Sequence, residues 1–273
     1  MLTSYNENVT VVKDITSEDI QTLDHAFSDC TDLVVDVEAV DLSREGDVSL
    51  VSIATRTHCY LFDVLDCTSI TDNTICYLKR LLEDESKKKV VHDCRMDSDA
   101  LEHICKVRIK NVHDTSCFHT VLHGEKEVSL NNLLAYYNIT KNTVRDRNVY
   151  KQNHAFWATR PLTDQMIEWA SNDVLKLFQV YDEQILEAIG NNKMLECLKM
   201  TEYYRTFCVN ANVKEILVKN PGAFIGQGGS NIKALRHRTN TCIYHRGCRD
   251  ENNFLVYYKH KKDFDQVQRV ARR

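Results

Sequence analysis

The chain has 273 residues, of which 43% are hydrophobic and 27% charged, with a formal net charge of −4, so it can bury a core and is long enough for two domains. No apolar stretch has the length of a membrane span and residues 1–8 lack the apolar segment of a secretory signal, so we expect neither a membrane protein nor a secreted one. Its eleven cysteines are isolated and odd in number, which is typical of reduced thiols in an intracellular protein, cytoplasmic or nuclear.

The first predicted element is a strand at residues 33–40, which contains Asp36 and Glu38. Side chains alternate along a strand, so these two carboxylates point to the same side of an otherwise apolar segment. Removing an unpaired carboxylate from water costs several kcal/mol, and two neighbours also repel each other. A divalent cation would stabilise the pair. The alternative is a strand end at which both acids stay solvated.

The next elements complete an α/β domain, which we place at residues 1–207. Strands are predicted at 48–55 and 59–64, a helix at 68–85, a strand at 89–92, a helix at 96–105, a strand at 107–112, and helices over 115–203 apart from a polar linker near 141–153. The short turns between the first three strands favour an antiparallel meander. A meander followed by alternating helices and strands is typical of a mixed sheet with flanking helices.

Two more acids can join the pair on the first strand. Asp97 lies at a strand-to-helix transition, with Asp93 and Asp99 as alternatives in a neighbouring register. Asp173 lies in a helix for which Thr163 has the side chain of an N-cap. Four acids from a strand, a strand end and a helix can hold two metal ions, and such ions stabilise both the attacking and the leaving oxygen in phosphodiester cleavage.

Four further polar residues are given structural interpretations or alternatives. The pair Asp114-Thr115 is expected to end a strand and cap the next helix, and not to bind metal. His92 is expected to be a hydrogen-bonded structural histidine. Arg160 either holds a substrate phosphate or pairs with a carboxylate.

These motifs resemble the DEDD superfamily of 3′–5′ exonucleases, in its ribonuclease D-like branch, across residues 33–183. The resemblance is carried by Asp36-x-Glu38, the spacing from His92 to Asp97, Val112-His-Asp114-Thr115, Arg160-Pro161-Leu162 and the helix ending in Asp173-Val174. It implies a ribonuclease H-like fold, with two Mg²⁺ or Mn²⁺ ions held by Asp36, Glu38, Asp97 and Asp173. The segment from His92 to Arg95 also resembles the subgroup of Egalitarian and the piRNA-pathway exonuclease-domain protein, whose members can be RNA-binding scaffolds.

One departure from the family pattern concerns the general base. The branch normally carries a tyrosine one turn before the last aspartate, and this chain has Trp169, whose indole can only donate a hydrogen bond. The related histidine-bearing branch places its base at the position of Glu168. Glu168 is either a substitute base or a solvated residue on the helix surface. A missing base costs about 10²–10⁴-fold in rate, so the sequence does not decide whether the chain turns over substrate.

The C-terminal part is predicted as strand, two helices, two strands and a helix. These elements fall at 214–218, 221–225, 230–236, 242–245, 254–258 and 263–271, with Gly226-Gln227-Gly228-Gly229 between the first two helices and Ser230 or Asn231 as a cap. Residues 210–273 hold 13 Lys and Arg against 5 Asp and Glu, a balance of +8. The rest of the chain keeps 22 of the 35 basic and 34 of the 39 acidic residues, a balance of −12. The basic part is therefore expected to contact a polyanion.

The Gly-rich loop within this order of elements resembles a KH domain over residues 211–273, which we place at 208–273. The resemblance implies a clamp on about four nucleotides of single-stranded RNA, built on the loop and the following helix N-terminus. The expected phosphate ligands are the loop Gly226, Gln227, Gly228 and Gly229 with Lys233, Arg236 and Arg238, above an apolar floor of Ile225, Ile232 and Ile243. The alternatives are a solvated basic face and a KH fold that binds protein. Cys242, His245 and Cys248 could also bind zinc, without a fourth ligand.

Three hypotheses remain, and we favour the first. In the first, the chain is a Mg²⁺- or Mn²⁺-dependent 3′–5′ exoribonuclease whose KH domain supplies the RNA strand. In the second, it is a nuclease-derived RNA-binding adaptor without turnover. In the third, it is a scaffold for protein partners in a ribonucleoprotein. Single-stranded DNA is the alternative substrate. A non-catalytic protein has no need of four repelling carboxylates, which is why we expect an enzyme.

Overall fold

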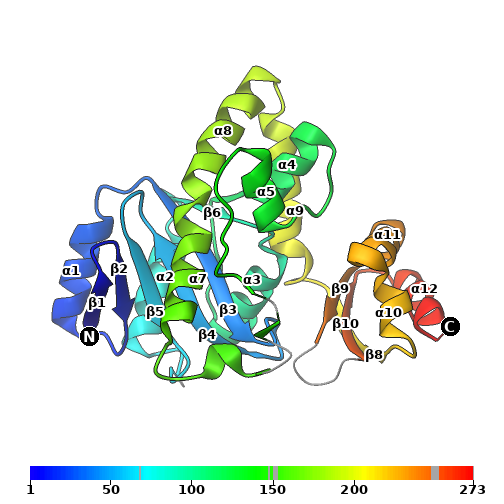
Figure 1. Ribbon diagram of the computed structural model, residues 1–273, viewed down its shortest axis with the longest axis horizontal. Coiled ribbons are helices and arrows are strands. Elements are labelled where there is room, and N and C mark those ends of the chain that lie inside the picture. Colours follow the sequence, from blue (N-terminus) through cyan, green and yellow to red (C-terminus); the bar gives the residue numbers. More distant parts are fainter. Residues whose placement is uncertain (68, 147, 150–152, 247–251, 273) are drawn as a thin grey trace. The chain divides into compact units, whose positions relative to one another are not determined.

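The computed structural model describes residues 1–67, 69–146, 148–149, 153–246 and 252–272 (Figure 1). The chain forms two compact units. The first unit consists of Met1–Asp146 with Trp157–Arg205, and the second of Arg147–Phe156 with Thr206–Arg273. Every helix among the described residues is too short or too polar to cross a bilayer.

A seven-stranded mixed sheet forms the centre of the first unit (Figure 1). In spatial order its strands are β1 (Leu2–Asn6), β2 (Val9–Val12), β5 (Cys59–Asp63), β4 (Asp47–Ala54), β3 (Asp32–Val40), β6 (Lys88–Val91) and β7 (Val112–Asp114). The strands β3, β4 and β5 form the predicted antiparallel meander, whereas β2, β6 and β7 each pair in parallel with a neighbour. The α/β architecture with a mixed sheet is therefore confirmed.

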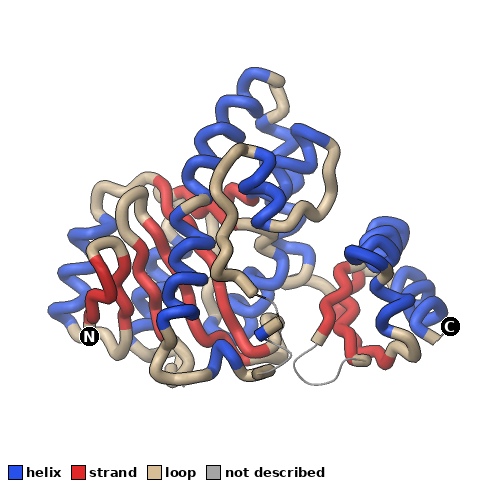
Figure 2. The backbone as a smooth tube through the Cα atoms, viewed as in Figure 1, coloured by secondary structure: helices blue, strands red, loops and turns tan. Residues whose placement is uncertain are grey.

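The helices of the first unit flank the sheet or pack on one another (Figure 2). They are α1 (Ser17–Phe27), α2 (Asn73–Glu83), α3 (Arg95–Ala100), the π-helix η1 (Leu101–Cys105), α4 (Thr115–His123), α5 (Leu130–Tyr136), the 3₁₀ turn η2 (Phe156–Ala158), α7 (Asp164–Leu175), α8 (Leu177–Gly190) and α9 (Met194–Phe207). Helix α7 packs across β3, β4 and β5, as Figure 2 shows. The central strands therefore carry a helix on the face that the acids of β3 occupy.

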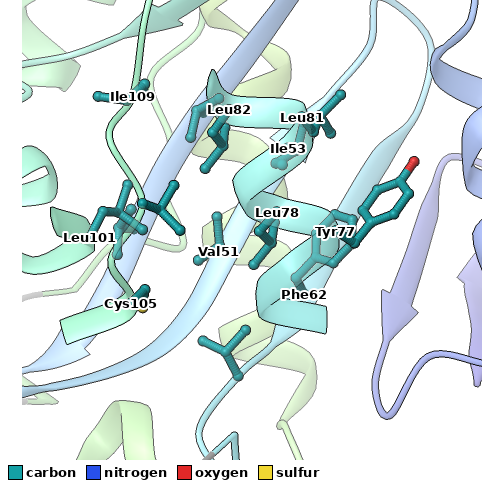
Figure 3. Packing of buried hydrophobic residues seen from close by; sticks show 14 of the residues in the cluster. Val51, Ile53, Phe62, Tyr77, Leu78, Leu81, Leu82, Leu101, Cys105 and Ile109 are labelled. Carbon is teal, nitrogen blue, oxygen red and sulfur yellow. The ribbon is translucent and has the colours of Figure 1, made fainter. Parts of the chain in front are cut away.

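The main core of the first unit lies on the opposite face of β3. Leu33, Val35 and Val37 belong to one hydrophobic cluster together with side chains of α1 and α2. Figure 3 shows α2 packing its Leu78 and Leu81 against the strands in this cluster. Because side chains alternate along a strand, Asp36 and Glu38 point away from this core and towards α7.

Two helices begin at the caps that the sequence predicted. The Asp114 carboxylate accepts hydrogen bonds from the backbone N–H groups of Ser116 and Cys117 at the start of α4. The Thr163 hydroxyl accepts from the N–H of Met166 at the start of α7. Each bond satisfies a donor that has no partner inside the helix. The start of α7 in turn sets the position of Asp173 within it.

Two predicted elements differ from the structure. The helix expected from residue 68 begins at Asn73, because the Asp72 carboxylate accepts from the N–H of Thr74 and caps it there. The strand expected at 107–112 is confined to Val112–Asp114. The backbone N–H groups of Val107 and Lys110 donate to carbonyls of Leu101 and Leu82, so this stretch does not join the sheet. The hairpin β1–β2 and helix α1 were not predicted.

The second unit has the predicted order of elements. It comprises β8 (Asn212–Leu217), α10 (Pro221–Ile225), the 3₁₀ turn η3 (Gln227–Gly229), α11 (Ser230–Thr239), β9 (Cys242–His245), β10 (Asn253–Tyr258) and α12 (Lys261–Ala271). The strands form an antiparallel sheet in the order β8-β10-β9. The expected Ser230 or Asn231 cap is wrong, since α11 begins after Gly229 without a side-chain cap. The Asn231 amide instead donates to the Ala223 carbonyl.

Candidate metal centre

Three acids from two elements meet on the α7 side of the sheet. One carboxylate oxygen of each of Asp36, Glu38 and Asp173 lies within 4.8 Å of the corresponding oxygens of the other two. We call these three residues the acidic cluster. Oxygens on opposite sides of one Mg²⁺ are about 4 Å apart, so this spacing is close to that of a metal ligand set. An all-oxygen donor set suits Mg²⁺ or Mn²⁺ better than zinc or copper.

The acidic cluster is electrostatically unfavourable without a cation. Asp36 and Glu38 are half-buried, and Asp173 is buried. Burial, followed by the charge of Asp173, raises the pKa of Asp36 to about 7. Burial and the charge of Asp36 raise the pKa of Glu38 well above its usual value. A bound divalent cation would offset both effects, so the residues present fit the metal that such a site requires.

Asp97 lies near the acidic cluster without belonging to it. Its side chain is buried, and burial together with the charge of Asp36 raises its pKa. The two alternatives are engaged elsewhere: Arg95 binds Asp93 at 2.6 Å, and Arg44 binds Asp99 at 2.7 Å. Among the described residues, Asp97 is outside the set whose oxygens approach within 4.8 Å. The structure therefore gathers three of the four predicted ligands tightly.

Asp173 is held by three side chains. Its Oδ1 accepts from the Asn142 amide at 2.8 Å, and its Oδ2 accepts from the Trp169 indole N–H at 3.0 Å. The Arg145 guanidinium also forms an ion pair with Oδ2. The Asn142 amide donates to the Trp169 carbonyl as well, at 3.0 Å, so the segment before α7 is tied to this helix. No sequence pattern pointed to Asn142 or Arg145, because both fall in the segment expected to be a polar linker.

Trp169 and Glu168 point in different directions. Trp169 is buried, and its ring packs edge-to-face against Trp157 with the ring centres 5.6 Å apart. Its N–H orients the carboxylate of Asp173 but cannot take a proton from water. Glu168 is exposed on the surface of α7 and is not among the gathered acids.

His92 and Arg160 have structural partners. The His92 Nε2 donates to the Val128 carbonyl at 3.1 Å, and its Nδ1 lies 2.9 Å from the Thr115 hydroxyl. Arg160 binds Asp63 through two hydrogen bonds of 2.8 and 2.7 Å and also donates to three backbone carbonyls. Of the two roles considered for Arg160, the structure therefore has the pairing with a carboxylate.

The glycine loop, residues 226–229, precedes α11 in the second unit. A Cβ on Gly226 would lie 2.7 Å from the Asn231 side chain, so only glycine fits there without displacement. Gly228 has a φ of 58°, in the left-handed region, and is exposed together with Gln227. The loop is thus a tight backbone turn open to solvent at a helix N-terminus.

The other residues expected to bind RNA differ in exposure. Arg238 is exposed and Lys233 is half-buried, whereas the Arg236 guanidinium donates to the Ile243 carbonyl at 3.1 Å. Ile232 and Ile243 are enclosed in the core of the second unit, and Ile225 packs at its margin. Ile232 and Ile243 are therefore core residues, and Ile225 is partly buried against that core.

The alternative zinc ligands do not form a described site. Cys242 is buried in β9, and the His245 ring stacks on Phe254 with the ring centres 4.5 Å apart. Cys248 lies outside the described residues.

Comparison with known proteins identifies relatives of the first unit. A family model described as a 3′–5′ exonuclease matches residues 9–187. Protein RRP6-like 1 of Arabidopsis thaliana is 30% identical over 172 residues, which are 62% of this chain and 25% of that protein. The piRNA biogenesis protein EXD1 of Xenopus laevis is 29% identical over 160 residues, 53% of this chain and 35% of that protein. The chain covers 14% to 45% of the curated relatives, less than half of their length.

Solved structures share the fold. RNase D of Trypanosoma brucei matches with a TM-score of 0.62 at 22% identity, over 74% of this chain and 73% of that chain. At this level of identity the likeness concerns the fold alone.

Proposed function

The chain belongs to the 3′–5′ exonuclease family, and we propose that it is a divalent-metal-dependent exoribonuclease acting on single-stranded RNA. The observation that carries this proposal is the approach of Asp36, Glu38 and Asp173 to within 4.8 Å of one another. Stability of the fold does not require three mutually repelling carboxylates on the α7 side of the sheet, because an apolar side chain at each position would be more stable.

The proposed metal ligands are the acidic cluster and Asp97, which would hold two Mg²⁺ or Mn²⁺ ions. Such ions, when bound, supply an activated water and stabilise the charge on the attacking and leaving oxygens. The chain itself positions the ligands: Trp169 and Asn142 orient Asp173 through hydrogen bonds to its two oxygens. Because Trp169 accepts no proton, the proposed enzyme lacks a general base at this position and turns over slowly. Glu168 is exposed on the surface of α7, which favours the solvated alternative over a substitute base.

We propose that residues 208–273 form a KH domain that holds the RNA strand. The order of elements, the glycine loop before α11 and the charge balance of +8 support this assignment. Backbone N–H groups of the loop, with Lys233 and Arg238, would contact phosphates. A related fold supports RNA as the substrate class, since one solved structure is that of Trypanosoma brucei RNase D in complex with RNA U12.

The proposal is tested with a 5′-labelled single-stranded RNA in Mn²⁺. Wild type is expected to shorten this RNA stepwise from its 3′ end, and Asp36→Ala is expected to leave it intact while still binding it. A matched single-stranded DNA decides between the two substrate classes. Wild-type protein that binds the RNA without shortening it, under conditions in which Mn²⁺ is bound, would reject the exonuclease.

The second candidate is an RNA-binding adaptor of the same fold. Trp169 in place of a base and the Arg145 ion pair with Asp173 favour it. Curated relatives include exosome complex component 10 of Homo sapiens, which supports protein partners in a ribonucleoprotein under either candidate. The ten described cysteines are all free thiols, which supports an intracellular location. RNA binding without degradation by wild type and Asp36→Ala alike would select the adaptor.

A further inference from the structure

Arg145 places a positive charge beside the acidic cluster. Its guanidinium forms an ion pair with Asp173 Oδ2 and lies 5.6 Å from the centre of the Trp169 ring. The Arg145 side chain is only 26% exposed, and that of Asp173 is 1% exposed. The charge of Arg145 also acts on Asp36 and Glu38, where it partly counters the effect of burial on their pKa values. This one cation therefore offsets part of the negative charge of the acidic cluster.

Three of the about four lone-pair positions of the Asp173 carboxylate are occupied, two of them on Oδ2. Its Oδ2 already accepts from Trp169 and Arg145, and its Oδ1 accepts from Asn142. A metal ligand needs a lone pair directed at the ion, and a guanidinium on the same oxygen repels a divalent cation. The Asn142 amide and the Trp169 indole are neutral donors, so neither repels a metal ion. Arg145 is thus the group whose departure would open Asp173 to a metal ion.

We propose that Arg145 and a divalent cation compete for Asp173, so that Arg145 acts as an internal counter-ion that sets the metal affinity of the site. This inference rests on the proposed metal-dependent function, and it adds the group that regulates metal loading. With Arg145 on Asp173, the acidic cluster is partly neutralised and metal binding is weak. With Arg145 displaced, all three carboxylates are available to the ion.

The test measures Mn²⁺ binding to the full chain by the electron paramagnetic resonance signal of free Mn²⁺. Arg145→Gln is expected to bind Mn²⁺ at least tenfold more tightly than wild type, because the competing charge is gone. Arg56→Gln is the matched control, since Arg56 pairs with Asp182 on the surface, where both side chains are half-exposed. This control is expected to keep wild-type affinity. Circular dichroism in EDTA reports whether each variant is folded.

A second measurement uses wild type and does not depend on the folding of Arg145→Gln. Because Arg145 lies against Trp169, displacement by Mg²⁺ should change the tryptophan emission in a saturable way. The change is expected to be absent in Trp169→Phe, which retains Trp157. Emission that stays constant while metal binds would overturn the competition.

The outcomes separate this inference from the proposed function. Equal Mn²⁺ affinity in wild type and folded Arg145→Gln, with binding lost in Asp36→Asn, would reject the role of Arg145 and keep the metal centre. Weaker binding in folded Arg145→Gln would also reject it. Absence of Mn²⁺ binding in every folded variant would reject the metal centre itself.

Discussion

Trp169 fixes the carboxylate of Asp173 through its indole N–H, yet it offers no atom that accepts a proton. A tyrosine at this position carries a hydroxyl that can donate to the carboxylate and also exchange a proton with water. We expect Trp169→Tyr to raise the rate constant for cleavage of single-stranded RNA by up to about 10²–10⁴-fold, the usual contribution of a general base. The measurement is single-turnover degradation of 5′-labelled RNA. The control Trp169→Phe can neither donate to the carboxylate nor exchange a proton with water. If Trp169→Tyr degrades the RNA no faster than Trp169→Phe does, the prediction is contradicted.

Arg160 and Asp63 form a buried ion pair that supports the loop before α7. The Asp63 side chain is only 5% exposed, so removal of Arg160 leaves a carboxylate without its counter-charge in the interior. We expect Arg160→Leu to lower the free energy of unfolding by about 3–5 kcal/mol, measured by urea denaturation. Lys13→Gln breaks a pair whose side chains are 38% and 66% exposed and should cost no more than about 1 kcal/mol. Similar losses in the two variants would refute the structural role of Arg160.

At the scale of elements, the glycine loop and α11 form the proposed surface for a nucleic-acid strand. Gln227 and Gly228 are exposed, and aspartate tolerates the left-handed backbone of position 228 better than most residues. We expect Gln227→Asp with Gly228→Asp to abolish binding of single-stranded RNA, because two carboxylates would face the phosphates. Fluorescence anisotropy with a labelled RNA measures the affinity.

The control for the loop variant adds the same charge elsewhere in the second unit. Gln266→Glu with Gln268→Glu introduces two carboxylates at half-buried positions of α12, outside the loop and α11. This control is expected to reduce affinity by less than about threefold at physiological salt, because it adds the same charge without placing it in the loop, and salt weakens longer-range effects. Equal losses in the two variants would indicate a general charge effect and not a loop contact.

At the scale of the whole molecule, the acidic cluster links stability to pH. Burial and Asp173 raise the pKa of Asp36 from its ordinary 3.8 to about 7 in the folded protein. Between these values the folded protein binds the proton more tightly than the unfolded chain does. The resulting stability is fully present below about pH 4 and is lost as the pH rises through about 7.

Asp36→Asn tests this linkage. Because the amide stays neutral, we expect the variant in EDTA at pH 8 to be more stable than wild type by about 1–3 kcal/mol, and the difference to vanish near pH 4. Urea denaturation across this pH range gives the free energies of unfolding. A difference that does not change with pH would show that Asp36 is not perturbed in the folded protein.

The sequence determined the central meander and the direction of its acids. Both follow from local geometry: a strand repeats every two residues, so Asp36 and Glu38 share a face whatever packs on it. The caps at Asp114 and Thr163 were equally predictable, because each depends on a side chain and the N–H groups next to it. The hairpin strand β1 was missed because most of it is exposed and lacks an apolar alternation.

The tertiary structure decided which groups meet the acids. Asn142 and Arg145 reach Asp173 across 31 and 28 residues, and nothing in a polar linker marks either as its partner. The same packing leaves Asp97 beside the acidic cluster and ties the backbone N–H groups of Val107 and Lys110 to helical residues instead of the sheet. The residue repeat of a single strand or helix determines the direction of a side chain. Which residues surround that side chain depends on how distant elements pack. This packing depends on burial and charge across the whole molecule, so no local sequence pattern reveals it.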